Sequence, residues 1–169
     1  ADLQTIQEEK GKLEGLKLAY IGDGNNMAHS LMIGCAKMGL DVAVAAPKGY
    51  QPHNKIVEQA QSFADGSEVL VTEDVVEAVK DADVIYSDVW ASMGQEAEQK
   101  EREKAFTHYQ VNKKLFSHAK QDAIFMHCLP AHREEEVTAE IIDGPQSVVF
   151  QEAENRLHAQ KALMVALMG

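Results

Sequence analysis

Short apolar runs alternate with longer amphipathic segments along most of this chain. The apolar runs predict strands at residues 16–21, 41–45, 68–72, 84–87, 123–127 and 147–150. The segments between them predict helices at residues 26–38, 52–61, 74–80, 112–118 and 154–168. Strands that alternate with helices of this length form a parallel sheet with helices on both faces. The pattern therefore predicts a doubly wound, Rossmann-like α/β fold.

Residues 1–12 have the pattern of an amphipathic helix that precedes the first strand. Leu3, Ile6 and Leu13 recur at a spacing that places them on one apolar stripe. The chain begins with neither an initiator Met nor a signal peptide. We therefore expect an excised domain or a processed fragment whose first helix was a connector.

The composition limits the classes of function. A length of 169 residues with 45% hydrophobic content suits one domain with its own core, and no apolar stretch is long enough to cross a membrane. The net charge of −11 argues against nucleic-acid binding, since phosphate recognition depends on clustered Lys and Arg. Cys35 and Cys128 indicate neither a disulfide framework nor a thiolate zinc site. Small-molecule ligands or protein partners are favoured, in a reducing, intracellular compartment.

The turn after the first predicted strand has a glycine pair, Gly22 and Gly24, which invites a dinucleotide interpretation. Met27 replaces the third glycine of that fingerprint, and the second strand ends without the acidic residue that would hold a ribose. We therefore do not expect NAD or FAD. Asn25 and Asn26 can cap the next helix or reach a ligand, and the pattern leaves both roles open.

The loop after the fourth predicted strand combines a carboxylate, a hydroxyl and a glycine. Asp88 can bind an ammonium group there, or it can cap the following turn while Trp90 and Met93 pack. Ser92 supplies the hydroxyl. The charged residues 95–104 that follow Gly94 have the pattern of a mobile lid or of a solvated helix face.

The fifth predicted strand ends in His127-Cys128-Leu129-Pro130. Adjacent strand residues point to opposite faces, so we expect no Cys–His nucleophilic pair and assign His127 a structural role. Cys128 is then either a small buried hydrophobe or a ligand-facing thiol whose partner is Asp88 on the neighbouring strand end. A metal site of His127, Cys128 and His132 would have no recognised spacing, and we expect none.

The last predicted helix carries an arginine near its beginning. Arg156 can bind a phosphate or a carboxylate in a fork. Glu152, at the i−4 position, offers it an ordinary ion pair instead. The sequence leaves these two interpretations open.

These separate segments together match one family. In chain order they are Gly22-Asp23-Gly24-Asn25-Asn26-Met27, Asp88-Val89-Trp90-Ala91-Ser92-Met93-Gly94, His127-Cys128-Leu129-Pro130 and Ala153-Glu154-Asn155-Arg156. The chain resembles the carboxy-terminal, ornithine-binding domain of ornithine carbamoyltransferases, and the resemblance covers nearly the whole chain. The Ser-Met-Gly loop separates these enzymes from their aspartate-specific relatives.

The resemblance implies transfer of the carbamoyl group from carbamoyl phosphate to the side-chain amine of ornithine, which gives citrulline and phosphate. It implies that ornithine is held by Asn26, Asp88, Ser92 and Met93. Asp88 and the Cys128 thiol would then lie beside the amine, which must lose its proton before it attacks.

The resemblance also implies residues for carbamoyl phosphate. The main-chain carbonyls of Cys128 and Leu129, presented by a cis Leu129–Pro130 bond, would accept hydrogen bonds from the carbamoyl NH₂ group. Arg156 would donate to the carbamoyl oxygen and stabilise the tetrahedral intermediate. The implied catalytic set is Cys128, Asp88 and Arg156, with no metal and no organic cofactor.

The amino-terminal half of such an enzyme is not in this sequence, since its Ser-Thr-Arg-Thr and His-Pro-x-Gln segments occur nowhere. We therefore predict an interdomain helix at 1–14, an ornithine-binding α/β domain at 15–153, and a C-terminal helix at 154–169 that returns to the missing domain. The full-length enzyme would be a homotrimer or a multiple of it. Its compartment would be the cytoplasm or, in a eukaryote, the mitochondrial matrix.

Three other classes stay open at this point. One is a carbamoyltransferase for another amine, such as putrescine or acetylornithine. Another is a nucleotide-binding oxidoreductase, and the last is a non-catalytic amino-acid-binding or interaction module. We expect the isolated chain to fold without turning over substrate, because the residues that would grip the phosphate are absent.

Overall fold

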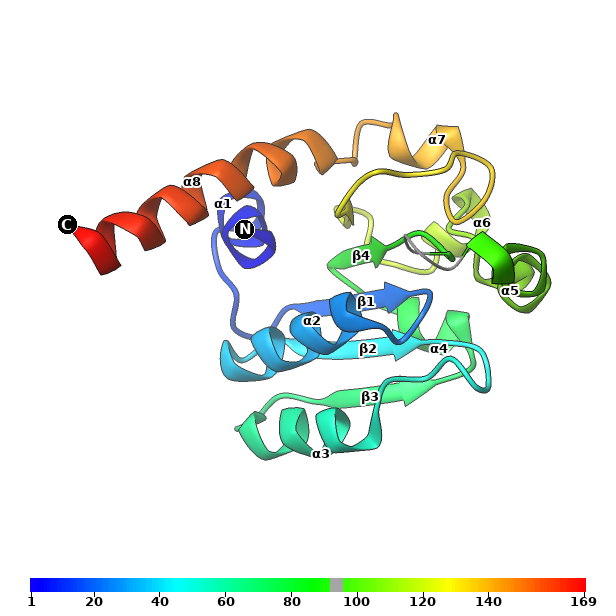
Figure 1. Ribbon diagram of the computed structural model, residues 1–169, viewed down its shortest axis with the longest axis horizontal. Coiled ribbons are helices and arrows are strands. Elements are labelled where there is room, and N and C mark those ends of the chain that lie inside the picture. Colours follow the sequence, from blue (N-terminus) through cyan, green and yellow to red (C-terminus); the bar gives the residue numbers. More distant parts are fainter. Residues whose placement is uncertain (92–95) are drawn as a thin grey trace.

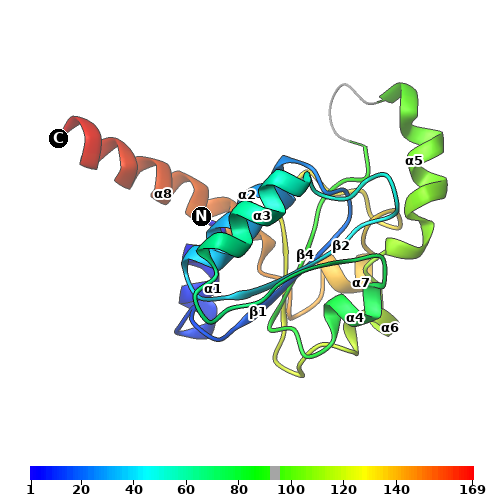
Figure 2. The same cartoon turned by 90° about the horizontal axis from the view of Figure 1, so that it is seen from below.

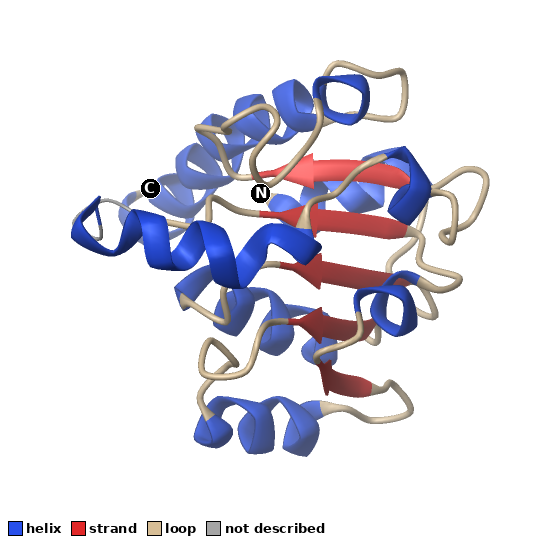
Figure 3. Cartoon of the chain, turned by 90° about the vertical axis from the view of Figure 1, so that its right-hand side faces the viewer, coloured by secondary structure: helices blue, strands red, loops and turns tan. Residues whose placement is uncertain are grey.

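The computed structural model describes residues 1–91 and 96–169 and contains a five-stranded parallel sheet (Figure 1, Figure 3). The strands lie side by side in the order β3-β2-β1-β4-β5. Their bounds are Lys17–Ile21 (β1), Asp41–Ala45 (β2), Val69–Thr72 (β3), Val84–Ser87 (β4) and Ile124–His127 (β5). The predicted α/β architecture is confirmed.

Helices connect the strands and cover both faces of the sheet (Figure 2). Short 3-10 turns at Glu96–Glu98 and Thr107–Tyr109 flank one of them, α5. The bounds of the α-helices are Asp2–Lys10 (α1), Asn26–Lys37 (α2), Asn54–Phe63 (α3), Val75–Val79 (α4), Gln99–Phe106 (α5), Lys113–Phe116 (α6), Ala139–Ile142 (α7) and Val149–Met168 (α8).

Two hydrophobic clusters, one on each face, bury the sheet. On β1, Leu18 and Tyr20 belong to one cluster, while Ala19 and Ile21 belong to the other. This alternation follows from the two-residue period of a strand. The first cluster is completed by residues of α1, α2 and α3, and the second by residues of α4, α5, α6, α7 and α8. Strands buried on both faces have the continuous apolar runs from which they were predicted.

The prediction of a strand at residues 147–150 is wrong. Ser147 forms only an isolated parallel bridge with Phe125, and α8 already begins at Val149. The bridge consists of the Phe125 amide donating to Gln146 and the Val148 amide donating to Phe125. An apolar β-branched run is ambiguous by composition alone, and here one turn of helix places Val149 in the core. The last helix is therefore longer than predicted.

The charged stretch at 95–104 leads through the 3-10 turn at Glu96–Glu98 into α5. On α5, Arg102 and Phe106 are buried while Gln99 and Lys100 are exposed. The helix thus has a solvated face, as one of the two interpretations predicted, and a buried face as well. The short helix α7 was not predicted.

The last helix, α8, extends beyond the body of the domain past α1 (Figure 1, Figure 2). Its first turn packs against the sheet, since Val149 and Glu152 are buried. Its second half carries a run of exposed apolar side chains, namely Leu163, Met164, Val165, Leu167 and Met168. Over the described residues, no helix has the length and apolar content needed to cross a membrane.

Candidate functional site

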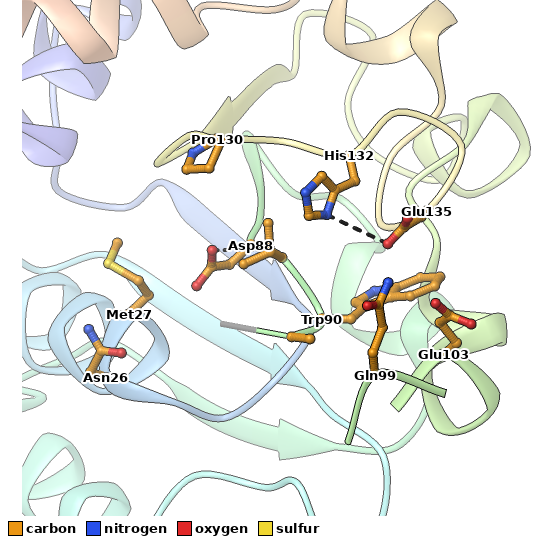
Figure 4. Close-up of a pocket in the computed structure, with 11 residues that line it drawn as sticks. Asn26, Met27, Asp88, Trp90, Gln99, Glu103, Pro130, His132 and Glu135 are labelled. Carbon is orange, nitrogen blue, oxygen red and sulfur yellow. Dashed lines mark hydrogen bonds and ion pairs between the residues drawn. The ribbon is translucent and has the colours of Figure 1, made fainter. Parts of the chain in front are cut away.

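A pocket of about 490 Å³ lies at the carboxyl ends of β1 and β4 (Figure 4). The strand order reverses between these two strands. The chain adds β2 and β3 on one side of β1, and then β4 and β5 on the other side. Open α/β sheets bind their ligands at this switch point. The residues that line the pocket are Asn26, Met27, Asp88, Val89, Trp90, Ala91, Gln99, Glu103, Pro130, His132 and Glu135.

Asp88 is the centre of the hydrogen bonds beneath the pocket. Its Oδ1 accepts from the Val89 amide at 2.8 Å and from the Cys128 thiol at 3.1 Å. Its Oδ2 accepts from Asn25 Nδ2 at 3.0 Å. The side chain is 6% exposed, so these donors replace most of the water that would otherwise solvate the carboxylate. Asp88 thus both caps its own turn and joins the ends of β1, β4 and β5.

Asn25 and Asn26 divide the two roles that the sequence left open. The Asn25 side chain caps α2 by accepting from the Met27 amide at 2.9 Å, while its amide group donates to Asp88. Asn26 is exposed and lines the pocket. Asn26, which the sequence analysis assigned to ornithine, thus lines the pocket, and its role as a ligand stays a prediction. The sequence analysis missed the role of Asn25 as the link to Asp88.

Cys128 is a half-buried thiol whose hydrogen-bond partner is Asp88, as one of the two interpretations predicted. Burial, together with the nearby Asp88 carboxylate, raises the pKa of Cys128 well above its ordinary value. The group is therefore a protonated thiol at neutral pH and not a thiolate nucleophile. This state fits its position as a donor to a carboxylate.

His127 has a structural role, as predicted. Its Nδ1 accepts from the Leu129 amide at 2.9 Å, which leaves the proton of the neutral ring on Nε2. That atom lies 3.3 Å from Glu136 Oε1, and both side chains are fully buried. The ring therefore fixes the turn that follows β5 and faces away from Cys128.

The turn after β5 has an unusual backbone. The Leu129–Pro130 bond is cis, and Leu129 has a φ of 52°. A non-glycine residue in this left-handed region costs roughly 1–2 kcal/mol, and such residues persist where the surroundings hold them. Here the holding contact is the hydrogen bond from the Leu129 amide to His127.

The charge of the pocket is negative. Asp88, Glu103 and Glu135 line it, and the described lining residues include neither Lys nor Arg. Figure 4 shows His132 and Glu135 on one side and Asp88 below them, with the dashed line marking the 3.6 Å approach of His132 Nδ1 to Glu135. Such a lining favours a cationic ligand, such as an ammonium group, over an anionic one.

One wall of the pocket is α5, which Arg102 attaches to the sheet. Its NH1 donates to Asp23 at 2.7 Å and to the Trp90 carbonyl at 3.0 Å, and its Nε donates to Glu98 at 3.1 Å. The guanidinium also lies 5.0 Å from the centre of the Tyr50 ring. Sequence analysis missed this residue, because a charged stretch gives no sign of which arginine is buried.

Arg156 does not lie in this pocket. It is exposed on α8, and it is not among the residues that line the pocket. The alternative ion pair with Glu152 is also not formed, because the Glu152 oxygens accept from Tyr86 and from the His127 amide. The prediction that Arg156 stands in the first turn of the last helix is wrong as well, since α8 begins at Val149.

Two other predicted site residues, Ser92 and Met93, lie outside the residues that the structure describes. The described part ends at Ala91 on the pocket side and resumes at 96. Their roles therefore stay predictions.

The hypothetical metal cluster of the sequence analysis does not assemble. His132 meets Glu135 and Glu136, with candidate ligand atoms within 4.8 Å of one another, and Cys128 is not in this group. Glu136 is already used as an acceptor, since its Oε1 receives the His132 amide at 2.6 Å. We interpret the group as a support for the turn.

The sheet order and the acidic pocket at its switch point define a ligand-binding domain of the doubly wound α/β class. The family model described as "Aspartate/ornithine carbamoyltransferase, Asp/Orn binding domain" matches residues 14–167. The chain therefore belongs to the aspartate/ornithine carbamoyltransferase family.

Individual relatives agree with this assignment. An ornithine carbamoyltransferase of Bacillus subtilis (strain 168) is 67% identical over 170 residues, which are 99% of this chain and 53% of that protein. Among solved structures, an ornithine carbamoyltransferase of Pyrococcus furiosus has a TM-score of 0.92 at 59% identity, covering 96% of this chain and 53% of its own. A mitochondrial ornithine carbamoyltransferase from Coccidioides immitis has a TM-score of 0.87 at 40% identity, and the match covers 98% of this chain and 53% of that one. The chain thus spans about half the length of these relatives.

Proposed function

We propose that this chain supplies the ornithine half of an active site that transfers a carbamoyl group from carbamoyl phosphate to the side-chain amine of ornithine. The products are citrulline and phosphate. The observation that carries the proposal is the acidic pocket above Asp88, in a chain that is 67% identical to a protein named ornithine carbamoyltransferase. Two or more carboxylates at a switch point attract an amino acid with a cationic side chain.

In this proposal Asp88 receives the side-chain ammonium group of ornithine, with Asn26, Ser92 and Met93 around the rest of the molecule. The Cys128 thiol, which donates to Asp88, holds that carboxylate in place. The amine must be neutral when it attacks the carbamoyl carbon, so either a general base takes its proton or the neutral amine binds. The carboxylate of Asp88 is the nearest candidate acceptor.

The carbamoyl group would lie against the turn after β5. We propose that the main-chain carbonyls of Cys128 and Leu129 accept from its NH₂ group and that Arg156 donates to its oxygen. The exposed position of Arg156 on α8 supports contact with a ligand held between this domain and the remainder of a longer protein. The absence of Lys and Arg from the described pocket lining supports a phosphate-binding site outside this pocket.

The remainder of that protein is the proposed partner. We propose that residues 1–14 connect to an amino-terminal carbamoyl-phosphate domain, that 15–153 form the ornithine domain, and that 154–169 return to the first domain. The exposed apolar side chains on the second half of α8 support this return. A homotrimeric full-length enzyme, located in the cytoplasm or in the mitochondrial matrix of a eukaryote, completes the proposal.

The test is calorimetric titration of ornithine into the full-length protein in the presence of carbamoyl phosphate or phosphate, together with an assay of citrulline. We expect ornithine binding, which Asp88→Asn weakens by at least about tenfold because it removes the charge that meets the ammonium group. Glu58→Gln, an equal loss of charge at an exposed position on α3, is the matched control. Stronger turnover of putrescine or acetylornithine would assign the site to another amine. Stabilisation by NAD and not by ornithine would contradict the proposal.

A further inference from the structure

Glu152 is a buried carboxylate beneath the turn that carries Cys128. It lies in the first turn of α8 and is 1% exposed. Its Oε1 accepts from the Tyr86 hydroxyl at 2.7 Å, and its Oε2 accepts from the His127 amide at 2.9 Å. Both oxygens are thus occupied by donors from two different strands.

These two donors stand next to the residues of the candidate site. Tyr86 lies on β4 two positions before Asp88, and His127 is the last residue of β5, immediately before Cys128. The Cys128–Asp88 hydrogen bond crosses between the same two strand ends. One carboxylate therefore attaches both strand ends to α8 where the paired residues of the sheet stop, at Ser87 and His127.

A buried carboxylate is a costly way to hold two strands together if its only role is packing. Isolated from water it needs several donors, and an apolar side chain of similar size would fill the same space at lower cost. A strongly accepting, ionised group has one advantage, since it fixes N–H and O–H donors at short distance and in defined directions.

We propose that Glu152 is a positioning residue of the candidate active site, holding the β4 and β5 ends so that Asp88, Cys128 and the Leu129 turn keep the geometry needed for carbamoyl transfer. The role of the geometry in catalysis rests on the proposed function. The positioning itself does not, because it concerns only contacts within this chain.

Protonation of Glu152 distinguishes a positioning role from a packing role, because it changes the hydrogen bonds of the carboxyl group and leaves its size unchanged. Burial, followed by the neighbouring Asp2 carboxylate of α1, raises the pKa of Glu152 to about 7, although the Tyr86 and His127 donors oppose this. Protonation replaces an acceptor by a donor, so one of the two incoming hydrogen bonds is lost. Other charged groups that act on this carboxylate pair are the amino group of Ala1 and Arg156, both of which act on Asp2. The titratable groups that the pair influences are the Tyr86 hydroxyl on β4, Cys128 after β5 and Cys35 on α2.

Three variants of the full-length protein test the proposal. Glu152→Gln keeps the shape, and its amide can accept from His127 and donate to the Tyr86 oxygen, but it does not titrate. Glu152→Ala removes both hydrogen bonds. Glu58→Gln, which removes a charge at an exposed position on α3, is the control. The measurements are the pH dependence of kcat for citrulline formation and the rate at which iodoacetamide labels Cys128, read by peptide mass spectrometry.

With positioning, Glu152→Ala lowers kcat about tenfold to a hundredfold with a smaller change in the KM for ornithine, because misplacement of reacting groups costs rates of this order. It also accelerates Cys128 labelling about tenfold, since the turn no longer holds the thiol against Asp88. Glu152→Gln stays within about threefold of the wild type at pH 8 and loses the extra decline, about tenfold at pH 6, that protonation of Glu152 adds.

The proposal is overturned if the kcat of Glu152→Ala and the rate at which its Cys128 is labelled both stay within about twofold of the wild-type values. If Glu152→Ala fails to fold, the decision passes to Glu152→Gln, whose pH profile must differ from that of the wild type. A wild-type protein that makes no citrulline would refute the proposed function alone, because Cys128 labelling still reports on the positioning.

Discussion

The thiol of Cys128 donates to Asp88 across the ends of two neighbouring strands, with Sγ 3.1 Å from Oδ1. Each group changes the chemistry of the other. Burial, together with the carboxylate, raises the pKa of the thiol and keeps it protonated, and the thiol supplies one of the donors that a 6%-exposed carboxylate requires. The pair is therefore a hydrogen-bonded unit, and the thiol in it is a donor to the carboxylate without nucleophilic character.

A first prediction concerns this pair. Asp88→Asn removes the negative charge next to the thiol, so the pKa of Cys128 falls and its alkylation at pH 7–8 accelerates several-fold. The measurement is the rate of iodoacetamide labelling as a function of pH, read on the Cys128 peptide. Cys35 is the internal control, because burial raises its pKa to about 12 and Asp88 is not among the groups that shift it. Unchanged Cys128 labelling would show that the carboxylate does not control the thiol.

A second prediction concerns the attachment of α5. Arg102→Met leaves the buried Asp23 carboxylate without its cation, so we expect a loss of about 3 kcal/mol in the free energy of unfolding. Urea denaturation measures this loss. Arg133→Met, which breaks the surface pair of Arg133 and Asp143, is the control and should change little. Equal effects of the two substitutions would mean that Arg102 does not attach the helix as described.

A third prediction concerns the pH dependence of stability. The pKa of Glu152 is raised from 4.5 to about 7 in the folded protein. The folded state therefore holds this proton more tightly than the unfolded state, so the stability that Glu152 contributes is fully present below pH 4.5 and is lost as the pH rises through 7. Glu152→Gln should remove this fall, which a comparison of urea midpoints at pH 5 and pH 8 detects. The prediction would be contradicted if the urea midpoints of the wild type and of Glu152→Gln changed equally between pH 5 and pH 8.

A fourth prediction concerns the second half of α8. Leu163→Gln with Leu167→Gln should leave the unfolding free energy of this chain within about 0.5 kcal/mol of the wild type, because both side chains are exposed. Val149→Ala, at the buried beginning of the same helix, should cost about 1 kcal/mol or more. In the full-length protein the double variant should be clearly destabilising if the helix packs on the other domain. Thermal and urea melts of both forms provide the measurement.

The fold was predictable because its strands are buried on both faces. The runs of β1 and β4 are short and largely apolar, with Lys17 at the beginning of one and Ser87 at the end of the other, which separates them from the helices around them. The failure at residues 147–150 has the same physical origin. Two valines and a phenylalanine fit a strand as well as a helix, and only tertiary contacts decide, here through the packing of Val149 and the bonds of Glu152.

The candidate site was predictable in part. Asp88 and Cys128 follow strands directly, so the topology of a parallel sheet brings them to one edge. Residues that depend on tertiary structure were missed, because nothing in the local pattern distinguishes them. Arg102 is one basic residue in a charged stretch, and Glu152 was considered only as an ion-pair partner of Arg156.

Trp90 gives the pocket an optical signal of its own. It is the single tryptophan of the chain, it stacks on Phe106 of α5, and its side chain lines the cavity beside Asp88. Any ligand that enters the pocket therefore changes the surroundings of the indole. Intrinsic fluorescence reports occupancy of this site without a label, and each variant described above can be followed by the same emission.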